Sequence, residues 1–331
     1  MKYAILALAL LTLACSKKES PSEAPSSDSM GTTHEAEAEG TEAAPAEAQP
    51  EEAVLPSVEP PVVELIDAGR PPLRKVRWQF EKGSDERLKM KSAYVFQADV
   101  KGAKAGPRAG QRQVLPTMLQ TIDFVIQDVS ADGLAEVTFE VRDDAILNTP
   151  NVTPGLHITG AKGATGTYRV DSTGVIHDFA FTPPPDANPR ADLEYVENLL
   201  RLMVFPVPDQ PIGVRAKWTV TRDVERRGIP MKEQVTLELL KLAGSQITLA
   251  FELKSNGSRQ TKVGKPSAEA LRTEETSWDA KGRTKSSLTK LVPRLSTLEN
   301  VLVLESKLTK PEGQTEQVDM IVERRIEMRR K

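Results

Sequence analysis

Residues 247–253 read Ile-Thr-Leu-Ala-Phe-Glu-Leu, with an apolar side chain at every second position. Successive side chains of a β-strand point to opposite faces, so this alternation predicts a strand with one buried and one solvated face. The same period recurs in residues 137–141, Val-Thr-Phe-Glu-Val, and in residues 318–323, Val-Asp-Met-Ile-Val-Glu. Repeated amphipathic strands of this kind favour a mainly β fold made of curved antiparallel sheet.

Turn-forming residues separate the alternating runs. Asp132-Gly133, Ala243-Gly244 and Asn256-Gly257 are dipeptides typical of tight connections between antiparallel strands. Asp171–Gly174 and Asp279–Gly282 share the pattern Asp-x-x-Gly, which suits a type I turn closed by a glycine in the left-handed region. We expect the chain to reverse direction at each of these sites.

One stretch departs from the strand period. Asn188 can cap a helix, and Pro189 can occupy the first helical position. The apolar residues that follow recur at helical spacing until Pro206. They are Leu193, Val196, Leu199, Leu200 and Met203. The pattern predicts one helix near 189–204.

The expected strands form a weak internal repeat. Residues 94–100 resemble residues 218–224, and residues 137–141 resemble residues 249–253. The Asp-x-x-Gly pattern that begins at Asp171 also recurs later in the chain, and the order of the matches is the same in both halves. We expect a sheet built from two similar halves, about 74–204 and 205–331. The alternative is the general similarity of antiparallel strand sequences.

The charge changes sign along the chain. Residues 16–60 contain two lysines and eleven acidic residues, are rich in Ala, Pro and Ser, and lack Phe, Tyr and Trp. Such a segment cannot bury enough apolar surface to fold, so we expect a disordered, extended linker. Residues 61–331 carry a mild net charge of +5 and supply the strands, so this part is the expected β-rich domain.

Residues 1–15 have the organisation of a bacterial lipoprotein signal peptide. One lysine precedes an apolar run, residues 4–14, that is shorter than the roughly 20 residues of a transmembrane helix. Residues 11–15, Leu-Thr-Leu-Ala-Cys, resemble the lipobox of bacterial lipoproteins, with threonine where leucine is usual. This resemblance implies lipidation of Cys15 and a membrane anchor in the cell envelope. In a Gram-negative host, Ser16 implies the outer membrane, facing the periplasm. The alternative is a secretory signal with an incidental cysteine.

The sequence contains no evident catalytic or metal-binding constellation. It has one cysteine, three widely separated histidines and no Gly-x-Ser-x-Gly motif. Gly264-Lys265 is followed by proline where a phosphate loop needs serine or threonine. The net charge of −3 excludes a strongly basic nucleic-acid binder. We therefore expect no enzymatic activity, no cofactor, no metal and no nucleic-acid partner.

Three polar features allow two interpretations each. His177 and Asp178 are neighbours on an expected strand, where adjacent side chains point apart, so a surface histidine is favoured over a His–Asp dyad. Asp143-Asp144 either begins a loop or supplies part of an acid–base pair. Arg324 shares the parity of the apolar residues around it, and either reaches solvent from a strand end or binds an anionic head group.

The organisation as a whole resembles β-rich bacterial lipoproteins whose domains have no assigned function. The features that carry the resemblance are the lipobox, the acidic linker and residues 211–218, Pro-Ile-Gly-Val-Arg-Ala-Lys-Trp, which open the second half. More distantly, a curved antiparallel sheet with a helix resembles the periplasmic lipoprotein-carrier fold. That resemblance implies a concave face able to hold acyl chains.

Two functional hypotheses follow. The leading one is a non-enzymatic envelope lipoprotein that binds a lipid or another hydrophobic ligand on a concave β face, because one helix covers only part of so large an apolar face. The alternative is a structural or assembly lipoprotein that acts through contacts with another envelope protein. A cavity would favour the first hypothesis, and close packing would favour the second. The candidate ligand-binding residues are Ile122, Phe124, Phe139, Leu249 and Phe251.

Overall fold

The expectation of a mainly β, antiparallel fold is confirmed. The computed structural model describes residues 53–54, 60–101, 110–147, 151–153, 161–184, 200–226, 229–258, 270–309 and 315–331. Its strands, in chain order, are β1 (Ala53–Val54), β2 (Val62–Asp67), β3 (Arg70–Arg74), β4 (Asp85–Lys101), β5 (Gln113–Val114), β6 (Thr117–Val129), β7 (Ala135–Leu147), β8 (Thr165–Val170), β9 (Ile176–Thr182), β10 (Ile212–Val214), β11 (Lys217–Arg226), β12 (Ile229–Ala243), β13 (Gln246–Ser258), β14 (Ala270–Ser287), β15 (Leu295–Thr309) and β16 (Thr315–Arg330).

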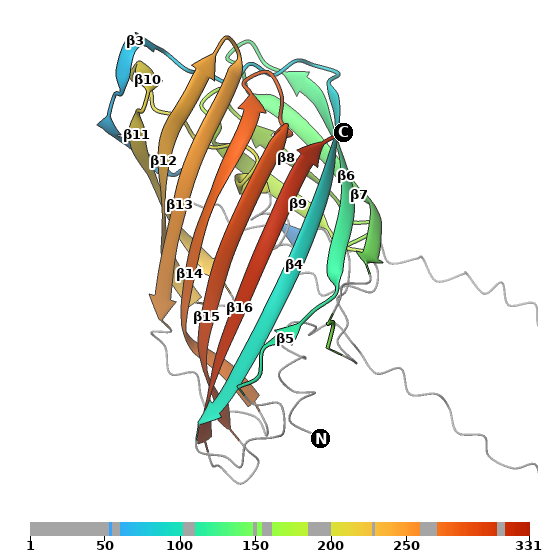
Figure 1. Cartoon of the computed structure of the whole chain (residues 1–331). Coiled ribbons are helices and arrows are strands. Elements are labelled where there is room, and N and C mark those ends of the chain that lie inside the picture. The colour runs from blue at the N-terminus through green and yellow to red at the C-terminus, as the bar shows by residue number, and fades with distance from the viewer. Residues whose placement is uncertain are drawn as a thin grey trace, which may run out of the picture.

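One large antiparallel sheet contains every strand except β3 and β10, which pair with each other. Its order is β1-β9-β8-β7-β6-β4-β16-β15-β14-β13-β12-β11-β2, and β5 pairs with β4. The chain therefore forms two meanders, β4 to β9 and β11 to β16, which are joined where β16 pairs with β4. Figure 1 shows the sheet curving so that the two meanders face each other across a common interior.

The ends of this sheet lie at β1 and β2. Ala53 and Val54 pair with Phe181 and Ala180 of β9, although both residues belong to the segment expected to be a disordered linker. The difference has a simple cause, since the edge of β9 offers unpaired backbone groups to any extended neighbour. Val62, the first residue of β2, follows Val54, the last residue of β1, by eight positions. An extended chain covers at most about 3.6 Å per residue, so these two edges of the sheet lie within about 29 Å of each other. The rest of the predicted linker, apart from Pro60, lies outside the described residues, as do the signal peptide and Cys15.

Two predicted turns are wrong, because the chain continues straight through them. Asn256-Gly257 lies within β13, and Asp279–Gly282 lies within β14. Gly282 faces Phe251 across this strand pair, and a Cβ there would lie 2.5 Å from Cζ of Phe251 and 2.3 Å from the carbonyl oxygen of Thr297. The glycine therefore makes room for an aromatic ring instead of turning the chain. The turn beginning at Asp171 is present, with Gly174 at a φ of 89°.

A matching contact occurs in the first meander. Gly166 of β8 lies opposite Phe139 of β7, and a Cβ at Gly166 would lie 2.5 Å from Cζ of the ring. Phe139 and Phe251 belong to the same buried cluster, and each lies on the third strand of its meander. The shared Phe–Gly pair supports the prediction of two similar halves. The third predicted match fails, because Asp171–Gly174 is a turn after β8 whereas Asp279–Gly282 lies within β14.

A non-strand segment fills the interior. Residues 200–207, which we call the interior strap, contribute Leu200, Leu202, Met203, Val204, Phe205 and Val207 to the main hydrophobic cluster. The predicted helix near 189–204 lies outside the described residues up to residue 199, and within the strap only Leu200 and Arg201 are helical. Among the described residues, no helix is long and apolar enough to cross a membrane.

One end of the interior is closed by the connection between β14 and β15, residues 288–294. Glu86 of β4 is 4% exposed, and its two carboxylate oxygens accept hydrogen bonds of 3.1 Å each from the backbone N–H groups of Leu291 and Val292. Arg330 Nη1 lies 3.8 Å from the same carboxylate. Leu291 and Val292 are themselves fully buried. One acidic side chain thus ties the first meander to a connection of the second.

Candidate functional site

The five candidate ligand-binding residues lie together, but in a closed interior. All belong to one hydrophobic cluster, and none is more than 4% exposed. Ile122 and Phe124 come from β6, Phe139 from β7, and Leu249 and Phe251 from β13. The two walls of the curved sheet therefore contribute to one packed core, and the interior surface at these residues is not open to solvent.

The interior strap accounts for this closure. The ring of Phe205 packs against that of Phe251, with centroids 4.9 Å apart. The indole N–H groups of Trp78 and Trp218 donate to the carbonyl oxygens of Phe205 and Pro206, at 3.2 and 2.9 Å. A void of about 20 Å³ remains between the strap and Phe251, which is room for about one water molecule. The strap occupies the place that a hydrophobic ligand would need.

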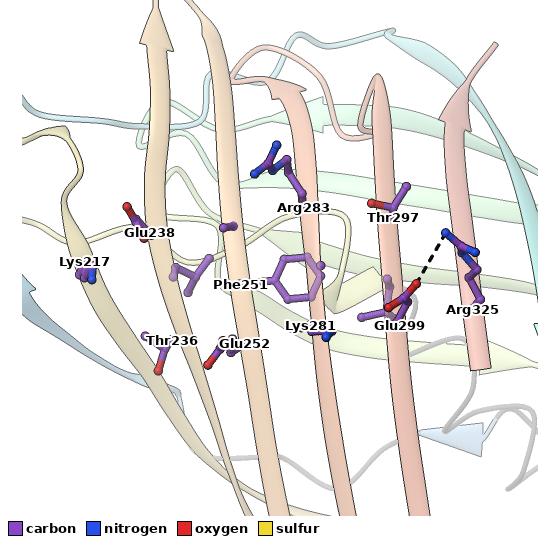
Figure 2. Close-up of a pocket in the computed structure, with 14 residues that line it drawn as sticks. Lys217, Thr236, Glu238, Phe251, Glu252, Lys281, Arg283, Thr297, Glu299 and Arg325 are labelled. Carbon is purple, nitrogen blue, oxygen red and sulfur yellow. Dashed lines mark ion pairs between the residues drawn. The ribbon is translucent and has the colours of Figure 1, made fainter. Parts of the chain in front are cut away.

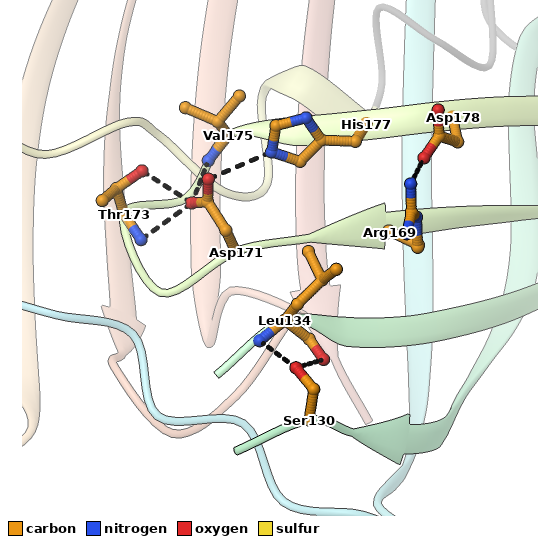
Figure 3. Close-up of polar contacts among 8 residues, drawn as sticks. All are labelled: Ser130, Leu134, Arg169, Asp171, Thr173, Val175, His177 and Asp178. Atoms are coloured by element: carbon orange, nitrogen blue, oxygen red, sulfur yellow. Dashed lines mark hydrogen bonds and ion pairs between the residues drawn. The ribbon is translucent and has the colours of Figure 1, made fainter. Parts of the chain in front are cut away.

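The β8–β9 turn holds the most connected polar group. Asp171 accepts hydrogen bonds from Thr173 N at 2.8 Å, Thr173 Oγ1 at 2.6 Å and Val175 N at 3.1 Å, and His177 Nε2 lies 3.0 Å from its other oxygen (Figure 3). Burial by itself would raise the pKa of Asp171, but the hydrogen bonds from Thr173, His177 and Val175 outweigh it and lower the pKa. Both carboxylate oxygens of Asp171 have partners, so this side chain stabilises the β8–β9 turn.

His177 does not pair with its neighbour in sequence. Asp178 forms an ion pair with Arg169 on the adjacent strand, while His177 reaches back to Asp171 (Figure 3). His177 and Asp178 thus point apart, as adjacent side chains of a strand do, and form no dyad. The contact of His177 with Asp171 could not be read from the sequence, because it depends on the pairing of β8 with β9.

The two neighbouring aspartates at the end of β7 also point apart. The strand register shifts between Val141 and Asp143, so that Asp144 lies opposite Gln120 and its oxygens are sheltered from solvent. Asp143 stays exposed, 3.9 Å from Lys162. Burial raises the pKa of Asp144. The carboxylates do not converge, and the interpretation of Asp143-Asp144 as an acid–base pair gains no support.

Arg324 lies in the middle of β16, not at a strand end. Its guanidinium carbon is 5.2 Å from the ring centre of Tyr94, its partner in the β4–β16 pair. A cation over an aromatic face is a common stabilising contact. Within the described part of the chain, no group of three His, Cys, Asp or Glu side chains could hold a metal ion.

Two hollows lie on the outer face of the sheet. One, of about 540 Å³, has the buried Phe251 and the partly buried Gly282 in its lining, and a neighbouring one of about 780 Å³ includes Val301. The two share four charged residues, Glu252, Lys281, Glu299 and Arg325. Figure 2 shows these side chains in a row across four strands. The sequence predicts only a solvated face at such positions, because which charges become neighbours depends on the strand register.

Comparisons with family models, with curated proteins and with solved structures found no match to this chain.

Proposed function

We propose that the protein is a lipid-anchored protein of the bacterial cell envelope that acts through protein–protein contacts made by the outer face of its sheet. The observation that carries the proposal is the occupied interior. Phe205 of the strap packs on Phe251, and the predicted ligand-binding residues are buried around it. The anchor rests on the lipobox that ends at Cys15. Chemistry on a substrate is not part of the proposal.

One observation favours the other hypothesis, a bound hydrophobic ligand. A second apolar cluster lies on the inner face beyond the strap, where β4, β15 and β16 continue. It is separate from the main cluster, and Tyr94 and Leu302 at its border are only partly buried. Its buried members are Phe96, Ala98, Leu115, Leu304, Val318, Met320 and Val322. A lipid chain lying along this cluster would leave the strap in place.

Lipid uptake separates the two hypotheses. Residues 53–331, exported behind a cleavable secretory signal and purified without detergent, are titrated with a fluorescent fatty acid. We expect no saturable uptake by the unchanged chain. Phe205→Ala is a matched control, because it removes a buried ring beside an existing void and should open a cavity that takes up benzene but is too small for the fatty acid. Uptake of one probe per unchanged chain would replace our proposal with the ligand-binding one.

The contact surface is tested separately in cells. A photocrosslinking residue at Thr297, which is exposed on the outer face, should give a discrete protein adduct. The same residue at Lys82, an exposed position in the turn before β4, is the matched control. Equal crosslinking at both positions, or none at either, would contradict a contact through the outer face.

A further inference from the structure

Four exposed charges form a continuous row across the outer face. Glu252 of β13 lies opposite Lys281 of β14, Lys281 opposite Glu299 of β15, and Glu299 opposite Arg325 of β16. The signs therefore alternate, negative, positive, negative, positive, on four consecutive strands (Figure 2). Strands lie about 4.8 Å apart, so each charge stands at a regular spacing from the next.

This row is only partly used within the chain. Glu299 and Arg325 form an ion pair of 3.6 Å, and their side chains are 57% and 77% exposed. In the part of the chain that the structure describes, Lys281 and Glu252 make no ion pair within 4 Å. An exposed pair of this kind contributes little to stability. The row is therefore poorly explained as a device that stabilises the fold.

The row is complementary to itself. A two-fold axis that lies between β14 and β15, parallel to the strands, brings two outer faces together and reverses the order of the charges. Lys281 then meets the partner's Glu299, and Glu252 meets the partner's Arg325. Each contact occurs twice, as in any isologous interface. A two-fold axis along the row itself would instead place Glu252 against the same residue of the second copy, so the alternation selects the first arrangement.

The flanking rows agree with the same axis. The next row of outward-facing residues, two positions along each strand from the central row, runs from Glu238 of β12 to Lys91 of β4. Glu238 faces the partner's Lys91, because both residues lie equally far from the axis. On the other side of the central row, Lys254 of β13 faces the partner's Glu323 of β16 in the same way. Glu238 and Glu323 already pair with Arg215 and Arg112 of their own chain. The central row, whose inner charges are not so engaged, therefore carries most of the specificity.

We propose that the outer face of β12 to β16 and β4 binds a second copy of this chain, with Lys281 and Glu299 at the centre of the interface. The inference deepens the proposed function by naming the partner. The balance of acids and bases in the row argues against a nucleic acid or an anionic membrane, each of which needs an excess of positive charge. Six strands, about 4.8 Å apart, span about 24 Å. Three rows of side chains, about 7 Å apart along the strands, span about 20 Å when the width of the side chains is included. This corresponds to roughly 500 Å² per copy, which is at the lower limit for a stable dimer, so we expect a weak one.

The test uses two charge-reversal variants, each of which should dimerise weakly alone but pair well with the other. In Lys281→Glu the central contacts become Glu against Glu, and in Glu299→Lys they become Lys against Lys. In a mixture, each altered residue meets its opposite charge on the other variant. Full-length protein in density-matched detergent is measured by sedimentation velocity, alone and as an equimolar mixture. The double variant, Lys281→Glu with Glu299→Lys, is the control that restores opposite charges at the central contacts between two identical chains.

We expect the unchanged protein to dimerise, each single variant to dimerise at least tenfold more weakly, and the mixture and the double variant to recover. Circular dichroism of each variant establishes that all are folded, which exposed positions allow. An unchanged protein that stays monomeric, single variants that dimerise normally, or a mixture that does not recover would each overturn the proposal. The failure of the proposed function is distinguishable, because it is saturable fatty-acid uptake or position-independent crosslinking, and neither depends on Lys281.

Discussion

Replacing Glu86 tests whether one carboxylate holds the two meanders together. In Glu86→Ala, the buried N–H groups of Leu291 and Val292 lose both acceptors, and Arg330 loses a nearby negative charge. A hydrogen bond to a charged group contributes about 1.5–3 kcal/mol, and an unsatisfied buried donor costs about 1–3 kcal/mol. These terms overlap, so we expect a loss of about 3–5 kcal/mol in the free energy of unfolding. Glu86→Gln keeps one acceptor and should lose about half as much.

Urea unfolding followed by tryptophan fluorescence measures this effect, because Trp78, Trp218 and Trp278 are buried in the same core. Glu305→Ala, at an exposed position on β15, is the matched control and should change the free energy of unfolding by less than about 0.5 kcal/mol. A Glu86→Ala protein within about 1 kcal/mol of the unchanged one would refute the reasoning. It would mean that the 288–294 connection can leave the core without loss.

Four further predictions concern five single substitutions. Gly282→Ala and Gly166→Ala should each lower the free energy of unfolding by about 1–3 kcal/mol in urea titrations, because their Cβ atoms would meet a ring and a backbone oxygen. Asp171→Asn should destabilise the fold by about 1 kcal/mol at pH 7. The lowered pKa of Asp171 means that its contribution is present above the ordinary value of 3.8 and is lost as the pH falls through the folded value, so thermal melts at pH 3 should show a smaller difference. Asp144→Asn should act in the opposite direction, because burial raises the pKa of Asp144. It should stabilise the fold at pH 7 by no more than about 1 kcal/mol, since the side chain is only partly buried, and the effect should disappear below the ordinary pKa of 3.8. Cys15→Ser should release the protein from membranes on fractionation and abolish labelling by palmitate; retention of either would contradict lipid anchoring.

The sequence predicted the strands well where burial differs between the two faces. The alternation in residues 247–253 matches β13, in which Ile247, Leu249, Phe251 and Leu253 are buried. Here local sequence and tertiary environment agree, since the period of a strand and the side of the core impose the same pattern.

Glycine was harder to interpret. At Gly174 it adopts a positive φ and closes a turn, whereas at Gly282 it lies in a strand and admits the ring of Phe251. Both occur in the same Asp-x-x-Gly pattern, so local sequence cannot separate the two uses. What distinguishes them is the residue across the neighbouring strand, which only the register reveals.

The candidate interface was beyond sequence reasoning for the same reason. Glu252, Lys281, Glu299 and Arg325 come from four strands and become neighbours only through three successive pairings. Of the interior strap, the helical spacing in the sequence picks out only Leu200 and Met203, and it predicts a helix for them. Phe205 lies outside that spacing, directly before Pro206, where the predicted helix ends.

The pairing of β16 with β4 has a kinetic consequence. These strands come from opposite ends of the domain in sequence, and they meet along almost their whole length. In a chain that folds from its N-terminus, β4 forms early, and its second edge stays uncovered until β16 has formed. Contacts between such distant segments slow folding, and an uncovered edge invites pairing with other chains. Folding in this order includes a stage in which the first meander is complete but the long edge of β4 is open, and this is the stage at which a chaperone would have the most to protect.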